Sequence, residues 1–166
     1  MKQLMKIVML LLVFISVKPV SAEWELGLES VAPTGDFEDI AGGGGGLYVK
    51  TFHEANKNLY LNFYIGALAY GGISFGGAEI QWYGYPITAG VTYYLNDIED
   101  GGLFLKANSG ALVKLGTVTF LGEEEEESET GSVFSLGGGW DFGAVSIAAD
   151  YNIGNNDWTW FAVKAA

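Results

Sequence analysis

The sequence predicts an all-β protein, an eight-stranded antiparallel up-and-down transmembrane β-barrel. Three observations lead to this fold class. Apolar and polar side chains alternate with a period of two along segments of about ten residues, the length that a tilted strand needs to cross a bilayer. The connections between these segments differ in length in an alternating way. No stretch after residue 22 is apolar enough for a membrane helix, so any membrane crossing must use strands.

Residues 1–22 have the three parts of a secretory signal peptide. Lys2 and Lys6 precede an apolar run over 7–17, and the small residues Ser21 and Ala22 close the segment. The run is shorter than the roughly 20 apolar residues that a membrane helix needs. We therefore expect cleavage after Ala22, with residues 23–166 forming one barrel domain.

The chain that remains after cleavage is strongly acidic. It keeps all twenty acidic residues and five lysines, and it contains no arginine, which gives a net charge of −15. Nucleic acid is excluded as a partner, because its binding depends on Lys and Arg that neutralise phosphates. Cysteine is also absent, so the stability of an exported domain must come from packing and hydrogen bonding.

Each strand is predicted from its own alternation. In 24–32, Trp24, Leu26 and Leu28 share one face, and Glu25 and Glu29 share the other. The same contrast recurs in further segments and is weaker in the second and the last: 44–52, 59–70, 87–95, 103–111, 134–142, 145–152 and 158–166. Alternation does not say which face meets lipid, so a soluble β-sandwich or lipocalin-like barrel remains open.

The connections place the two ends of the barrel. Those over 33–43, 71–78 and 113–131 are long, and we expect them outside the cell. The turns over 53–58 and at Gly143 are short. An even number of strands returns both termini to the same side, which we expect to be the periplasm.

The longest connection carries an exposed acidic loop, Glu123, Glu124, Glu125, Glu126 and Glu127. Calcium loops space their ligands around a glycine, and a run of adjacent glutamates lacks that geometry. Five neighbouring like charges are typical of a solvated segment. We therefore predict no metal site here, although divalent ions that bridge these carboxylates to anionic phosphates remain an alternative.

Aromatic residues gather near both ends of the predicted strands, as an aromatic girdle at two membrane interfaces requires. One band is expected on the periplasmic side and comprises Trp24, Tyr93, Trp140 and Phe142. The other is expected on the outer side and comprises Trp82, Tyr83, Phe134, Tyr151 and Trp158.

Five ionisable residues fall on the faces that we assign to the lumen: Glu25, Glu29, Lys50, Lys106 and Asp150. Opposite charges inside a narrow barrel are expected to pair, since an isolated buried charge is costly. Our hypothesis is that Lys50 meets Glu25 or Glu29. With Tyr60, Tyr64, Tyr94 and Phe104 also pointing inward, a wide pore is not expected.

No catalytic or cofactor-binding residues are predicted. His53 is the only histidine and falls in a short turn, away from any nucleophile. The glycines 42–46 lack the Lys-Ser/Thr of a phosphate-binding loop and favour a flexible loop that runs into a strand.

The chain resembles the small OmpX-like and OmpW-like β-barrels of Gram-negative outer membranes. The resemblance rests on "APTGDFEDIAGGGGGLYVK", "VTYYLND" and "FSLGGGWDFG" followed by "VSIAADYNIG". It implies a monomer in contact with outer-membrane lipid and lipopolysaccharide, with a structural or surface-interaction role. A conduit for small apolar molecules and a soluble periplasmic barrel that binds a small ligand are the alternatives. Family members usually end on an aromatic residue, whereas this sequence ends on Ala166.

Overall fold

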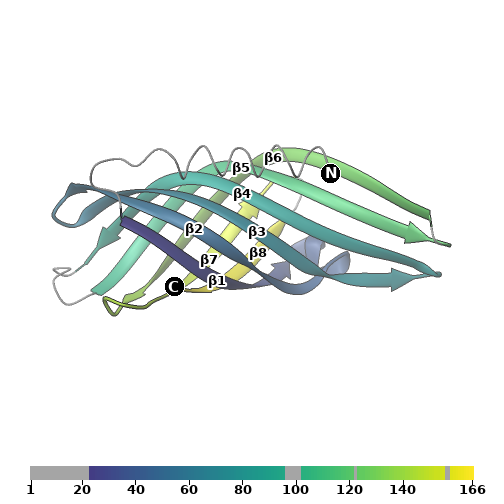
Figure 1. Ribbon diagram of the computed structural model, residues 1–166, viewed down its shortest axis with the longest axis horizontal. Coiled ribbons are helices and arrows are strands. Elements are labelled where there is room, and N and C mark those ends of the chain that lie inside the picture. Colours follow the sequence, from purple (N-terminus) through teal and green to yellow (C-terminus); the bar gives the residue numbers. More distant parts are fainter. Residues whose placement is uncertain (1–22, 96–101, 122, 156–157) are drawn as a thin grey trace.

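The computed structural model describes residues 23–95, 102–121, 123–155 and 158–166, so the predicted signal peptide lies outside the described residues. The eight strands form one closed ring in chain order, in which each strand pairs with its neighbours and β8 pairs with β1 (Figure 1). All the pairings are antiparallel. The strands are β1 (Glu23–Thr34), β2 (Gly42–Asn56), β3 (Leu59–Phe75), β4 (Ala78–Tyr94), β5 (Gly102–Phe120), β6 (Glu123–Asp141), β7 (Ser146–Gly154) and β8 (Thr159–Ala165). The predicted all-β, up-and-down, eight-stranded barrel is confirmed.

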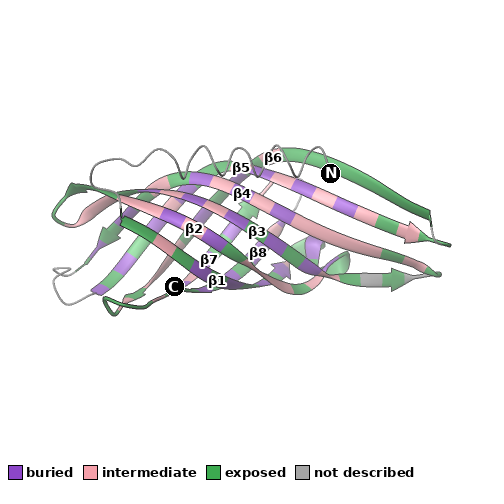
Figure 2. Cartoon of the chain, viewed as in Figure 1, coloured by how far each residue is buried: buried purple, intermediate pink, exposed green. Residues whose placement is uncertain are grey.

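The two faces of the barrel wall are the reverse of those of a soluble protein. Leu26 is 72% exposed and Leu28 is 63% exposed, whereas Glu29 of the same strand faces the lumen and is buried. Buried residues alternate with more exposed ones in the barrel body, whereas the first eight residues of β6 are all exposed (Figure 2). Apolar side chains therefore cover the outside, and polar and charged ones fill the lumen.

β8 closes the ring although its sequence alternates poorly. It pairs with β1 from Leu28 opposite Ala165 to Thr34 opposite Thr159. Its buried face consists of Trp160, Ala162 and Lys164, which differ in size and polarity. Because of this mixture, hydropathy does not alternate clearly along β8.

Two of the predicted outer loops are strands instead. β3 and β4 continue to Phe75 and from Ala78, and Gly76 and Gly77 make the turn with φ of 61° and 87°. Glycine suits this turn because it adopts positive φ without steric cost. The prediction of a long loop over 71–78 is therefore wrong.

The predicted acidic loop over 113–131 is wrong in the same way. β5 and β6 pair in register from Gly102 opposite Asp141 to Phe120 opposite Glu123. The glutamates 123–127 thus form part of a strand, although they are exposed as expected. These strands have 19 residues each, nearly twice the length that the sequence predicted.

β3, β4, β5 and β6 reach beyond the other four strands at one end of the molecule (Figure 1). Pairing of β2 with β3 ends at Gly42 and Gly71, and pairing of β6 with β7 ends at Val133 and Gly154. We call the projecting part the outer sheet: residues 72–75, 78–81, 115–120 and 123–131. The opposite end of the barrel, where Glu23 and Ala166 lie, is called the inner end.

The first long connection, 33–43, contains a short 3-10 helix, η1 (Gly35–Asp39). Phe37 of this helix is 1% exposed and belongs to a buried cluster with residues of β1, β3, β5, β6 and β8. Within the described residues, no helix is long and apolar enough to cross a membrane.

Candidate functional site

The lumen is held by a chain of ion pairs. Lys106 Nζ lies 3.0 Å from Asp150 Oδ1, and Lys164 Nζ lies 3.0 Å from Asp150 Oδ2. Lys164 continues the chain, because its Nζ is 3.3 Å from Glu29 Oε2. All four side chains are buried, so each charge has its partner in a place that water hardly reaches.

A second, less buried pair lies nearer the inner end. Lys50 Nζ is 3.7 Å from Glu25 Oε1, and Glu25 stands directly opposite Lys50 in the register of β1 and β2. The Tyr48 hydroxyl also donates to Glu25 Oε1 at 2.9 Å. The partner of Glu29 is Lys164, and the Tyr64 hydroxyl donates to it as well.

Lys164 is a lumen residue that the sequence analysis missed. It follows the apolar run "WTWFAV", in which no polar residue marks the inward face. Counting acids against lysines gives a signal, since Glu25, Glu29 and Asp150 outnumber Lys50 and Lys106 by one. Lys164 supplies a further positive charge and pairs with two of these acids, Glu29 and Asp150.

Glycine on β6 makes room for this network. A Cβ atom at Gly137 would collide with Asp150 Oδ1 and with the backbone carbonyl oxygen of Ala149. Gly137 stands opposite Asp150 in the register of β6 and β7. The side chain of Asp150 can therefore lie across the strand and reach its two lysines.

An aromatic plug fills the lumen toward the outer sheet. Phe37 stacks on Trp158 with ring centroids 4.1 Å apart and meets Tyr70 edge-on at 5.0 Å. Trp160 is buried in the same cluster, and Trp82 packs against it. Since η1 supplies Phe37, the first connection folds back into the barrel instead of extending into solvent.

Two residues predicted for the outer girdle belong to this plug. Trp158 is only 5% exposed, and its ring meets that of Trp82 edge-on at 5.3 Å. The Trp82 indole N–H donates to the carbonyl oxygen of Ile40 at 3.0 Å. Both side chains thus turn inward, and their assignment to a lipid-facing girdle is wrong.

The remaining predicted girdle residues lie on the outside of the wall. Tyr83 is partly exposed, and the others are exposed: Trp24, Tyr93, Trp140, Phe142, Phe134 and Tyr151. Trp140 and Phe142 lie near one another, with ring centroids 6.2 Å apart. Their contact with a membrane interface stays a prediction.

The outer sheet presents carboxylates to solvent. Glu123 to Glu127 pair through their backbones with Phe120 to Gly116 of β5, and their side chains are exposed. Lys114 lies where this sheet joins the barrel body. Its Nζ is 3.4 Å from Glu129 Oε2 and donates to the carbonyl oxygen of Asn155 at 3.0 Å. The sequence analysis did not single out Lys114.

The structure places the two motifs that we read as structural within β2. His53 is exposed near the end of β2, where it pairs with Leu61, so it lies in a strand and not in the predicted turn. The glycines 42–46 also belong to β2, and not to a flexible loop. Within the described residues, no group of three or more His, Cys, Asp and Glu side chains could hold a metal ion.

An apolar exterior around a charged, filled lumen defines the class of the protein. A soluble barrel places its apolar side chains inside, and this one places them outside over most of the wall. The ring has no unpaired edge over the barrel body, as lipid requires of strands that cross it. The chain is therefore a transmembrane β-barrel.

No protein-family model matches the chain, and no curated protein matches it in sequence. Its fold is nevertheless found in solved structures. Ail, the attachment invasion locus protein of Yersinia pestis, superposes with a TM-score of 0.67 at 16% identity over 87% of this chain and 93% of Ail. Neisserial surface protein A superposes with a TM-score of 0.56 at 14% identity over 87% of this chain and 96% of that one.

The N-terminal β-barrel domain of Pseudomonas aeruginosa OprF gives a TM-score of 0.50 at 9% identity, over 84% of this chain and 93% of that domain. Ail has also been solved in complex with the heparin analogue sucrose octasulfate, and that structure gives a TM-score of 0.63 at 16% identity over 87% of this chain and 94% of Ail. These likenesses show that the chain has the fold of the small eight-stranded barrels of bacterial outer membranes.

Proposed function

We propose that the protein is an outer-membrane barrel of a Gram-negative bacterium that acts at the cell surface through its outer sheet. The barrel body spans the membrane as a monomer in contact with lipid and lipopolysaccharide. The inner end, with both termini, faces the periplasm. The fold shared with bacterial surface barrels supports this location, and so does the exposed apolar wall.

The observation that carries the proposal is the free edge of β6. Residues 123–131 pair with β5 on one side, and β7 begins its pairing only at Val133. Within the described residues, no strand pairs with the other side of residues 123–128, so this side offers backbone N–H and C=O groups for pairing. Such an edge can accept a further strand from another chain, with backbone hydrogen bonds supplying the affinity.

The charge on that edge selects the partner. Glu123 to Glu127 are consecutive, so their side chains alternate between the two faces of the sheet. An extended segment paired alongside would meet carboxylates on either face. A cationic peptide fits this edge, because opposite charges speed encounter and like charges exclude the wrong partners.

A sulfated polysaccharide does not fit. Ail was solved with the heparin analogue sucrose octasulfate, which is a polyanion. The outer sheet of the present chain carries exposed glutamates in a chain of pI about 4.2. We therefore expect the two barrels to share a fold and to differ in the charge of their ligands.

The alternatives have less support. A conduit for small apolar molecules needs an open or apolar passage, whereas the lumen holds buried Lys106, Asp150 and Lys164 below the plug around Phe37. A soluble periplasmic barrel would leave its apolar wall in water. Exposed apolar patches of more than a few hundred Å² are rare on soluble monomers.

The test is peptide binding by the purified barrel in detergent micelles. A fluorescent peptide of alternating lysine and threonine is expected to bind saturably, and sucrose octasulfate is not expected to compete. Replacing Glu123 to Glu127 by glutamine should weaken binding at least about ten-fold. Glu54→Gln at the exposed inner end is the matched control, and equal loss in both variants would disprove the role of β6.

A further inference from the structure

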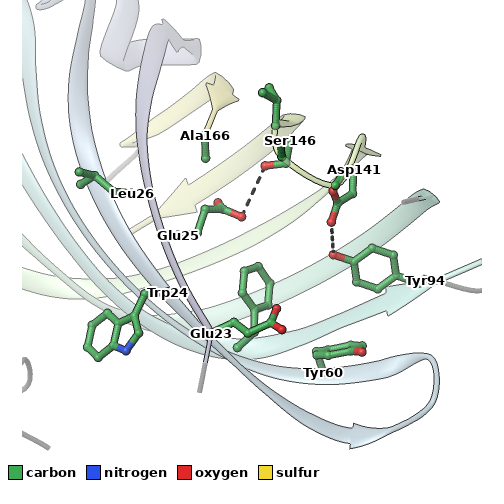
Figure 3. A pocket seen from close by; sticks show the side chains of 13 residues that line it. Glu23, Trp24, Glu25, Leu26, Tyr60, Tyr94, Asp141, Ser146 and Ala166 are labelled. Atoms are coloured by element: carbon green, nitrogen blue, oxygen red, sulfur yellow. Dashed lines mark hydrogen bonds between the residues drawn. The ribbon is translucent and has the colours of Figure 1, made fainter. Parts of the chain in front are cut away.

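The inner end of the lumen opens into a cavity that has no part in the proposed surface function. Its volume is about 360 Å³, within the range of about 300–1,000 Å³ that small-molecule sites occupy. We call it the inner vestibule (Figure 3). Its lining comes from six strands and the β6–β7 turn and includes Glu23, Glu25, Phe52, Tyr60, Tyr94 and Asp141.

Hydrogen bonds fix two of the three carboxylates of the vestibule. Asp141 Oδ2 accepts from the Tyr94 hydroxyl at 3.0 Å, and Asp141 Oδ1 accepts from the Gly143 backbone N–H at 2.7 Å. Glu25 Oε2 accepts from the Ser146 hydroxyl at 3.4 Å. Figure 3 shows the carboxyl groups of Glu23, Glu25 and Asp141 around one open space. A ligand would therefore meet charges that are already oriented.

Aromatic rings form the wall beside these carboxylates. The rings of Phe52 and Tyr60 are 6.5 Å apart, and those of Tyr60 and Tyr94 are 5.5 Å apart, in edge-to-face arrangements. The face of such a ring attracts a cation within about 6 Å of its centroid. The vestibule thus combines negative charge with π faces.

The protein itself places a cation on this combination. Lys50 Nζ lies 4.0 Å from the centroid of the Phe52 ring and 3.7 Å from Glu25 Oε1, at the back of the vestibule. The amino group of Lys50 therefore lies between a carboxylate and an aromatic ring. This contact involves neither Glu23 nor Asp141, and it is the arrangement that we expect a ligand cation to repeat at the front.

The lysines of the lumen are paired farther in. Lys50 is paired with Glu25, Lys106 with Asp150, and Lys164 with Glu29 and Asp150. The carboxylates of Glu23 and Asp141 lie at the front of the vestibule, beside the rings of Tyr60 and Tyr94. Buried Lys50 and Phe104 fill the lumen farther in, so a molecule that enters stays near the mouth.

We propose that the inner vestibule binds a small organic cation, with its ammonium or guanidinium group between Glu23 and Asp141 and its carbon stem on Tyr60. The site is a blind pocket and not the entrance to a channel. A guanidinium group suits it well, because its plane can stack on an aromatic ring while its N–H groups donate to a carboxylate. Access is from the end of the barrel opposite the outer sheet.

The experiment is calorimetric titration of the folded barrel in micelles with agmatine, which carries one guanidinium and one ammonium group. Saturable binding is expected. Asp141→Asn keeps the shape of the side chain and removes its charge, and Tyr60→Leu removes the ring. Each should weaken agmatine binding at least about three-fold, because Asp141→Asn removes a negative charge beside the bound cation and Tyr60→Leu removes a cation–π contact.

Two comparisons locate the site. The variant with glutamine at 123–127 has its changes on the outer sheet, so its agmatine affinity should equal that of the parent barrel. Mg²⁺ alone should not displace agmatine at equal concentration, because it gains nothing from the rings. Equal affinity for agmatine in Asp141→Asn, or equal competition by Mg²⁺, would overturn the proposal, and retention of the folded gel mobility by Asp141→Asn excludes misfolding as the cause.

Discussion

The same side chain, a carboxylate, occurs in two regions of this barrel under opposite conditions. In the lumen, Asp150 is 1% exposed and lies within ion-pair distance of two lysines. On the outer sheet, Glu123 to Glu127 are exposed and follow one another along the chain, with no lysine among them. Burial makes a charge depend on its partner, and exposure removes that need.

One hairpin contains both conditions. β5 and β6 run without a break from Lys106 opposite Gly137 in the barrel body to Phe120 opposite Glu123 in the outer sheet. Backbone pairing is the same throughout, and only the surroundings of the side chains change. The strand therefore gives the geometry, while burial decides which substitutions it tolerates.

The largest effect is expected for Asp150→Asn. Without its negative charge, Lys106 and Lys164 would face each other in a buried place, and removal of one partner of a buried ion pair costs about 3–5 kcal/mol. The midpoint of urea unfolding of the barrel in micelles should fall accordingly. An unchanged midpoint would mean that water reaches the lumen and that burial does not separate the two regions.

The aromatic residues extend the same comparison to apolar side chains. Trp158→Ala empties the plug and should lower the free energy of unfolding by about 3 kcal/mol, in line with large-to-small changes in packed cores. Phe134→Ala on the outer wall leaves no cavity and should cost less than half as much. Equal losses, measured by the same urea titration, would place Trp158 in the lipid-facing girdle after all.

A smaller effect is expected for Lys50→Met. Glu25 would lose its lysine but keep the hydroxyl groups of Tyr48 and Ser146, and it is partly exposed at the vestibule. We expect a loss of about 1 kcal/mol, typical of a pair that water still reaches. A loss as large as that of Asp150→Asn would show that the inner end is as dry as the middle of the lumen.

The smallest effect is expected for glutamine at positions 123–127. Exposed surface substitutions usually change stability by less than about 0.5 kcal/mol, and the removal of like-charge repulsion acts in the stabilising direction. Heat-modifiable gel mobility and the urea midpoint should match those of the parent barrel. Failure of this variant to fold would contradict the view that these glutamates serve recognition and not assembly.

Period-two alternation predicted most of the fold. A wall that is apolar outside and polar inside makes the two faces of each strand chemically distinct. It identified the lumen positions of Glu29, Lys106 and Asp150, whose neighbours along the chain are apolar or small. It could not show that Asp150 takes two lysines, since one of them comes from β8, where Trp160 and Ala162 conceal the inward face.

The sequence analysis failed where composition and conformation disagree. Residues 123–127 were predicted as a loop because five adjacent like charges are typical of a solvated segment, yet pairing with β5 keeps them extended. Trp158 was predicted to face lipid because it lies near a strand end. It turns inward because Phe37 of η1, which no periodicity links to it, supplies the stacking partner.

The most direct test of the account uses the absence of cysteine from the chain. Glu125→Cys lies on the outer sheet, and Lys57→Cys lies in the turn between β2 and β3 at the inner end. With intact cells and a membrane-impermeant maleimide, Glu125→Cys should be labelled at once, and Lys57→Cys only after the outer membrane is opened. Labelling in the reverse order, or recovery of both variants in the soluble periplasmic fraction, would contradict the account.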